Sequence, residues 1–228
     1  GFELTERAKK MRPGMIVIVM TGFIDDFSYD RAIQAGASDF IKKPFTLMEL
    51  RARIDHVKLQ EKQRLMAMTD ELTGICNRRG FFNLAEQQLR LSKRLKKGIY
   101  MLYADVDNLK IINDTLGHNT GDMALVDAAN ILKATYRESD IIARIGGDEF
   151  VVAPIGTTGD SIEAVTGRLE DNLAQHNATG DRRYKLQLSF GVAYCDPENA
   201  CSVDELVAQA ERMMYEHKRS KHKTSPLS

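Results

Sequence analysis

The chain has 228 residues, which is enough for one complete domain and part of another. Its 32 basic and 32 acidic residues cancel, so bulk charge favours neither nucleic acid nor an anionic membrane as a partner. No apolar run is long enough to span a bilayer, and three cysteines without CxxC spacing argue against a disulfide framework or a zinc site, so we expect a cytoplasmic protein.

The first 68 residues predict the order helix, strand, helix, strand, helix. Met15–Met20 is a continuous apolar run, typical of a parallel strand that is covered on both faces. We then expect a helix over Tyr29–Ala37, a short strand over Asp39–Ile41 and a long helix from Leu47 to about Met68.

Apolar residues recur along the long helix with 3-4-3 spacing at Leu47, Leu50, Ile54 and Val57. Such a stripe either pairs with a second chain or packs on a neighbouring sheet, and we expect the sheet. The stripe degrades beyond Val57, so residues 57–69 are predicted to form a helical linker.

Three strings in this region resemble the second half of a response-regulator receiver domain: Met20-Thr21-Gly22, Ala35-Gly36-Ala37-Ser38-Asp39-Phe40 and Lys43-Pro44-Phe45. The resemblance would make Thr21 and Lys43 the residues that sense phosphate on an aspartate. No phospho-accepting aspartate at a strand end precedes Thr21, so we interpret residues 1–56 as a partial, flavodoxin-like receiver remnant. Thr21 and Lys43 are then ordinary polar residues, and we expect no switching by phosphorylation.

Residues 70–228 are predicted to form a second domain. Its elements are helix Phe81–Leu95, strand Ile99–Val106, strands Asp140–Ile145 and Glu149–Ile155, strand Leu186–Tyr194 and helix Val203–Arg219. We expect Asp70 and Arg79, near the start of the domain, to be structural: a turn residue and its charged partner.

Carboxylates stand at two strand ends of this domain. Asp105 falls where a buried strand should be apolar, so its carboxylate must be paired, hydrated or bound to a cation. Asp148 and Glu149 follow Gly146-Gly147, a pair that we expect to supply positive φ angles at a hairpin tip. Two neighbouring strands would bring Asp105 and Asp148 together, and magnesium prefers such oxygen ligands.

The string Gly146-Gly147-Asp148-Glu149-Phe150 matches the signature of the GGDEF family, so the chain resembles a diguanylate cyclase. The resemblance implies an α/β (α+β) fold: a palm-like or ferredoxin-like nucleotidyl cyclase domain with a mostly antiparallel sheet, preceded by the receiver remnant and a long linker helix. It also implies condensation of two GTP into cyclic di-GMP and two pyrophosphates. Each active site would hold one GTP, so a homodimer is needed.

The resemblance also assigns roles around the carboxylates. Asp105, the backbone carbonyl of Val106 and Asp148 would hold two Mg²⁺ (or Mn²⁺) ions in each active site. Asp148 would also act as the base, with Glu149 assisting. Lys110 would add positive charge near the phosphates, unless it is simply a solvated helix lysine.

Nucleotide recognition is assigned in the same way. Asn113 and Asp122 would read guanine, and His118 would lie close to the nucleotide. A carboxylate accepts hydrogen bonds from the donor edge of guanine, which adenine lacks, so Asp122 predicts a preference for GTP. Lys218 would contact the triphosphate, while His222 stands where the family usually has an arginine.

Arg137-Glu138-Ser139-Asp140 matches the RxxD inhibitory motif of the family, with five residues between it and Gly146. Arg137 and Asp140 would then bind the product, cyclic di-GMP, for feedback inhibition; a surface ion pair is the alternative. The alternative function is a catalytically silent cyclic di-GMP receptor that uses this site, against which the intact carboxylates at the strand ends argue.

Overall fold

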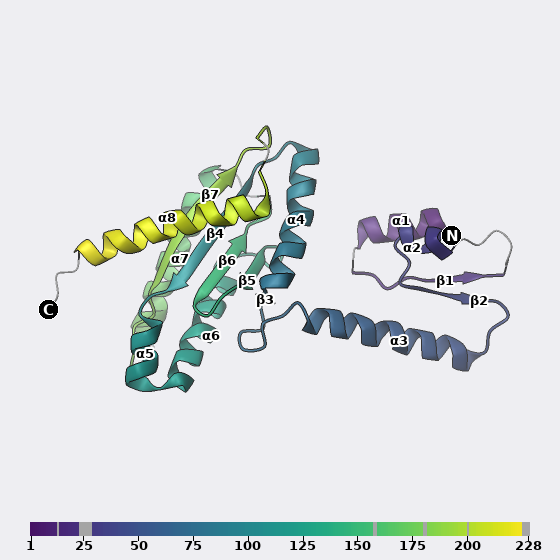
Figure 1. The fold of residues 1–228 in the computed structure, drawn as a ribbon, viewed down its shortest axis with the longest axis horizontal. Helices are drawn as coiled ribbons and strands as arrows, with labels where there is room; N and C mark the ends of the chain where they lie inside the picture. The colour runs from purple at the N-terminus through teal and green to yellow at the C-terminus, as the bar shows by residue number, and fades with distance from the viewer. Residues whose placement is uncertain (13, 23–28, 157–158, 180–181, 200, 225–228) are drawn as a thin grey trace. The chain divides into compact units, whose positions relative to one another are not determined.

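The structure is a computed structural model that describes residues 1–12, 14–22, 29–156, 159–179, 182–199 and 201–224 (Figure 1). The chain divides into two compact units, Gly1–Met66 and Ala67–Ser228. None of the helices in the described ranges combines the length and the apolar character that crossing a membrane requires.

The first unit contains α1 (Phe2–Met11), β1 (Ile18–Thr21), α2 (Tyr29–Gln34), β2 (Asp39–Lys42) and α3 (Leu47–Met66). This is the predicted order of elements. β1 and β2 pair in parallel, with Ile18 opposite Asp39. α3 packs against β2, and it buries Val57 while leaving Leu47 85% exposed, so only part of the predicted stripe is covered within this unit.

The second unit contains a five-stranded sheet with helices on both faces. Its elements are β3 (Cys76–Asn77), α4 (Arg78–Leu95), β4 (Ile99–Val106), α5 (Leu109–Leu116), α6 (His118–Thr135), β5 (Ile141–Arg144), β6 (Glu149–Ala153), α7 (Gly159–Thr179), β7 (Leu188–Cys195) and α8 (Val203–Thr224). The strand order is β3-β5-β6-β4-β7, and only the β3–β5 pair is parallel. The mostly antiparallel sheet agrees with the prediction.

Alternation along β4 divides the core into two layers. Leu102 and Ala104 pack with α6 and α7 on one face, whereas Met101 and Tyr103 pack with α4 and α8 on the other. Asp105 follows Met101 and Tyr103 by the same periodicity, so it belongs to the face that α8 covers. Figure 1 shows α8 lying across β7 and β4.

Gly191 on β7 lets α8 approach the sheet closely. A Cβ atom at this position would lie 2.1 Å from the Met214 backbone nitrogen and 2.4 Å from the Ala210 carbonyl oxygen. Because these are backbone atoms, a side chain here would push the helix away from the strand. The missing side chain therefore fixes where the later residues of α8 fall over the sheet.

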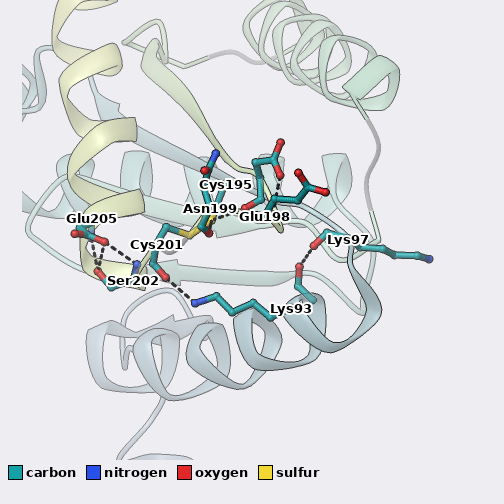
Figure 2. Close-up of a disulfide and its surroundings, with 10 residues drawn as sticks. Lys93, Lys97, Cys195, Glu198, Asn199, Cys201, Ser202 and Glu205 are labelled. Atoms are coloured by element: carbon teal, nitrogen blue, oxygen red, sulfur yellow. Dashed lines mark hydrogen bonds between the residues drawn. A yellow bond between two sulfur atoms is a disulfide. The ribbon is translucent and has the colours of Figure 1, made fainter.

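A disulfide joins Cys195, at the end of β7, to Cys201, just before α8 (Figure 2). Lys93 of α4 donates a hydrogen bond to the Cys201 carbonyl at 3.1 Å, and Ser202 and Glu205 form a capping box at the start of α8. The expectation that the cysteines form no disulfide was wrong. The turn brings the two Cα atoms within 6.4 Å, a proximity that counting cysteines and their spacing does not reveal.

Candidate active site

The register of the sheet brings the two predicted metal carboxylates to one end of it. Asp105 pairs with Glu149 on β6 and with Ser189 on β7. The Val106 N–H donates to the backbone oxygen of Asp148 at 3.0 Å, so the chain at Asp148 is held against the end of β4. Asp105 is only 8% exposed, whereas Asp148 is half-buried.

Lys218 of α8 reaches the same point, and its Nζ donates to Asp105 Oδ1 at 2.5 Å. Burial raises the pKa of Asp105, Lys218 opposes this, and the charges of Asp148 and Asp107 add to the increase. Burial also lowers the pKa of Lys218, but the hydrogen bond to Asp105 and the nearby carboxylates outweigh it, so this pKa is raised. The site therefore combines the carboxylates of Asp105, Asp107 and Asp148 with the ammonium group of Lys218.

The glycine turn differs from the prediction in its backbone. Neither Gly146 nor Gly147 has a φ in the left-handed region. Gly146 lies against the Glu149 side chain: a Cβ there would come within 2.0 Å of Glu149 Oε2, so the carboxylate of Glu149 would have to move aside. Arg144 closes the turn by donating from Nε and Nη2 to the Gly147 carbonyl, at 3.1 and 2.8 Å. The sequence analysis missed this role of Arg144, whose signal was its place at the end of β5, directly before the turn.

Asp70 also differs from the prediction, because its charged partner is Arg144 and not Arg79. Arg144 Nη1 lies 3.3 Å from Asp70 Oδ1, and Thr73 donates to the same oxygen from its backbone and its hydroxyl, at 2.9 and 2.5 Å. The pairing joins the entry loop of the domain to the glycine turn across 74 positions of sequence. Proximity in the sequence suggested Arg79, but tertiary packing brings Arg144 closer.

Asp107 is fixed by β7. The hydroxyl of Ser189, which is fully buried, donates to Asp107 Oδ1 at 2.7 Å, and the Asp107 N–H donates to the Gln187 carbonyl at 2.9 Å. Asn108 then adopts a φ of 60°, which turns the chain from β4 into α5. Ser189 was missed as a supporting residue, although a serine within an apolar strand was a visible signal.

The residues predicted to read the base lie on α5 and α6. Gly121 packs directly beneath Asn113, because a Cβ on Gly121 would lie 1.8 Å from Asn113 Oδ1. Asn113 is thereby brought next to the chain at Asp122, in the first turns of α6. Asp122, His118 and Lys110 all have exposed side chains. Position 222 lies on α8, but its side chain is outside the described part of the structure.

The RxxD motif lies at the other end of β5 from the glycine turn. The Asp140 carboxylate accepts hydrogen bonds from the backbone N–H groups of Arg137 and Ile155, both at 2.9 Å. Asp140 therefore closes the turn before β5 and ties it to the chain after β6. Arg137 is exposed and, together with Asp140, lines a cleft of about 660 Å³ between α4, the end of α6 and β5.

Comparison with known proteins gives two family matches. The family described as "Diguanylate cyclase, GGDEF domain" matches residues 67–224, and the family described as "Response regulator receiver domain" matches residues 1–55. The first match covers more than half of the chain and contains all of the predicted site residues.

Individual relatives agree with these matches. Diguanylate cyclase DgcP of Escherichia coli is 33% identical over 157 residues, which are 68% of this chain and 46% of DgcP. The structure resembles diguanylate cyclase SiaD of Pseudomonas aeruginosa, solved with its activator SiaC, with a TM-score of 0.64, 26% identity and coverage of 76% of this chain and 66% of SiaD. It also resembles the GGDEF domain of DgcB from Caulobacter crescentus in complex with c-di-GMP, with a TM-score of 0.61, 26% identity and coverage of 68% and 89%. The chain thus spans about half the length of DgcP.

Proposed function

The chain belongs to the GGDEF family, and we propose that it condenses two molecules of GTP into cyclic di-GMP and two pyrophosphates. The observation that carries the proposal is the placement of Asp105 and Asp148 at one end of the sheet, beside Lys218. Two carboxylates and one ammonium group at the end of a strand suit a triphosphate with its counter-ions.

The residues fit a pair of divalent cations. The donors are all oxygens, and Asp105 is a buried carboxylate whose pKa is raised first by burial and then by the charges of Asp148 and Asp107, so nearby cations would stabilise its charged form. Within the described ranges no three His, Cys, Asp or Glu side chains gather as a metal cage. Mg²⁺ characteristically takes one or two protein carboxylates together with substrate phosphates, so Asp105, the Val106 carbonyl and Asp148 would hold two Mg²⁺ or Mn²⁺ ions with the help of GTP.

When bound, these ions neutralise charge on the triphosphate and lower the pKa of the attacking hydroxyl. Asp148 takes the proton from the 3′-hydroxyl of the partner nucleotide, assisted by Glu149. The 3′-oxygen attacks the α-phosphorus, and pyrophosphate leaves. Lys218 and Lys110 bind the phosphates, and Lys218 is the better placed because it already lies at Asp105.

Asn113 and Asp122, which the close contact at Gly121 brings together, are proposed to recognise the guanine base. Asp122 accepts hydrogen bonds from N1 and the 2-amino group of guanine, and the amide of Asn113 supplies a further donor and acceptor. His118 lies beside the nucleotide at the start of α6. Each domain holds one GTP, so two chains must face each other for the ring to close.

The RxxD motif is proposed to bind the product, cyclic di-GMP, and so to inhibit the enzyme. Arg137, which is exposed beside the 660 Å³ cleft, binds cyclic di-GMP there, and Asp140 shapes the turn and contributes its carboxylate.

The cytoplasm is the proposed location, because the substrate is GTP.

The test is chromatography of the products after incubating the chain with GTP and Mg²⁺. Wild type and the matched control Asp171→Asn, which changes an exposed carboxylate on α7, should form cyclic di-GMP, whereas Asp148→Asn should not. If wild type gives no product at high protein concentration but still binds cyclic di-GMP, the proposal fails and the chain is a receptor.

A further inference from the structure

β7 is an edge strand whose outer backbone groups need partners. It pairs with β4 on one side, and no other strand of the described chain pairs with it. The Asp107 N–H bonds to the Gln187 carbonyl, so by antiparallel alternation the Phe190–Ala104 pair is of the non-hydrogen-bonded kind. The N–H and C=O of Phe190 therefore point outward, away from β4, where an unpaired group costs stability.

His217 of α8 occupies this position. Its Nδ1 lies 3.0 Å from the Phe190 carbonyl oxygen and 3.4 Å from the Phe190 nitrogen. The imidazole also meets the Phe190 ring edge-on, with 5.3 Å between the ring centroids. When Nδ1 carries the proton it donates to the carbonyl, and in the other tautomer it accepts from the N–H. Either form fastens α8 to the same residue of β7.

Lys218, the next residue of α8, makes the ion pair with Asp105. Asp105 is the cross-strand partner of Ser189, which immediately precedes Phe190. His217 and Lys218 therefore hold two adjacent positions of the sheet, about one helical turn beyond the close contact at Gly191. A shift of this turn along β7 would move the Lys218 ammonium group away from Asp105.

We propose that His217 is a positioning residue: its bond to the outer backbone of Phe190 fixes the turn of α8 that delivers Lys218 to Asp105. For nucleotide binding the inference rests on the proposed function, because Lys218 is there a phosphate contact. The placement of Lys218 itself does not depend on any activity.

Two substitutions of His217 distinguish the effect of the Nδ1 hydrogen bond from the effect of the packing of the ring. His217→Phe keeps an aromatic ring against Phe190 but replaces Nδ1 with a C–H group. His217→Asn loses the ring but places an amide nitrogen or oxygen near the position of Nδ1. Tyr215→Phe is the matched control, because Tyr215 lies on the same helix and is exposed.

The first readout is the rate at which a small acylating reagent modifies Lys218 in the folded 228-residue chain, mapped by mass spectrometry. The paired ammonium is protected, because only the neutral amine reacts. The rate should rise about five-fold in His217→Phe, the equivalent of one lost hydrogen bond. It should return towards the wild-type rate in His217→Asn and stay unchanged in Tyr215→Phe.

The second readout is the KM for GTP, which should rise about five-fold in His217→Phe by the same argument, with a smaller change in kcat. A lower melting temperature in His217→Phe with unchanged Lys218 reactivity would overturn the inference, because His217 would then only stabilise the fold. If the wild type makes no cyclic di-GMP, the proposed function fails, while the acylation rates still decide the role of His217.

Discussion

Asp105 is a carboxylate at a position where a central strand normally carries an apolar side chain. Its pKa is raised by burial and by neighbouring carboxylates, and the ion pair with Lys218 offsets this only in part. Replacing a buried ion pair with apolar residues often stabilises a protein, so stability alone gives little reason for this arrangement. Binding of cations and phosphates is a better reason for a carboxylate at this position, because residues that break the apolar pattern of a strand concentrate at functional sites.

Asp122 is a second single residue with a testable role, because it should determine whether the chain prefers GTP or ATP. In Asp122→Ser the side chain no longer accepts two hydrogen bonds from guanine, so the preference for GTP over ATP should fall by about 10- to 100-fold. Competition between the two nucleotides in a binding assay measures this ratio. Asp114→Ser, at an exposed position on α5, is the control, and an unchanged ratio in Asp122→Ser would remove Asp122 from base recognition.

Asp70 should give a pH-dependent contribution to stability. Burial raises its pKa, but hydrogen bonds from Thr73 and the charge of Arg144 outweigh burial, so the pKa lies below its ordinary value of 3.8. A lowered carboxyl pKa stabilises the fold above pH 3.8, and this contribution is lost as the pH falls through the folded-state pKa. Asp70→Asn should therefore cost about 1 to 2 kcal/mol at pH 7 and much less at strongly acidic pH.

Urea unfolding at several pH values measures the Asp70 contribution, with Glu71→Gln as the exposed neighbouring control. An equal difference between wild type and Asp70→Asn at all pH values would show that the carboxylate charge is not the cause.

Some contacts of the site residues could be predicted from the sequence, and others could not. The proximity of Asp105 and Asp148 was predictable, because carboxylates after an apolar run and after a glycine pair mark the ends of two strands that pair in the sheet. The ion pair of Arg144 with Asp70 and the bond of His217 to Phe190 were not predictable, since these partners lie in other segments and only the fold brings them together. The positive φ angles expected at Gly146 and Gly147 were wrong: neither glycine has a φ in the left-handed region, and only Gly146 lies against the Glu149 side chain, whereas a Cβ on Gly147 would meet nothing within 4 Å.

At the scale of elements, the site depends on how α8 lies on β7. Gly191→Ala would place a Cβ against backbone atoms of Met214 and Ala210, which cannot rotate away. The variant should lose about 1 to 3 kcal/mol of stability, as is usual for overpacking, and should also expose Lys218 to acylation. Gly167→Ala on α7 is the matched control: a Cβ there meets nothing within 4 Å, so this change should be neutral or slightly stabilising.

Denaturant unfolding compares the two glycine variants. Equal stabilities for Gly191→Ala and Gly167→Ala would contradict the close approach of α8 to β7.

Elements were more predictable than their contacts. β4 has the predicted bounds, because its apolar run is continuous and buried on both faces. β5 and β6 also follow their patterns, and they end one or two residues from the predicted bounds. The disulfide after β7 was not foreseen, because it depends on the path of the turn and not on the spacing of the cysteines.

At the scale of the whole molecule, one domain supplies half of the proposed reaction. If two chains must meet, the rate per chain should rise in proportion to protein concentration when most chains are monomeric. Measuring product formation over a hundred-fold range of dilution, with analytical ultracentrifugation at the same concentrations, tests this. A rate per chain that does not change across the monomer–dimer transition would contradict catalysis between two chains.

The central claim is that Asp105 and Asp148 hold metal ions together with the nucleotide. Equilibrium dialysis of the chain against Mn²⁺ and a non-hydrolysable GTP analogue measures this directly, with circular dichroism to verify that each variant is folded. Wild type should retain about two Mn²⁺ per chain in the presence of the analogue, and Asp105→Asn and Asp148→Asn should each retain clearly fewer. If both variants retain as much Mn²⁺ as wild type, the carboxylates at this end of the sheet are not the metal site, and the account fails.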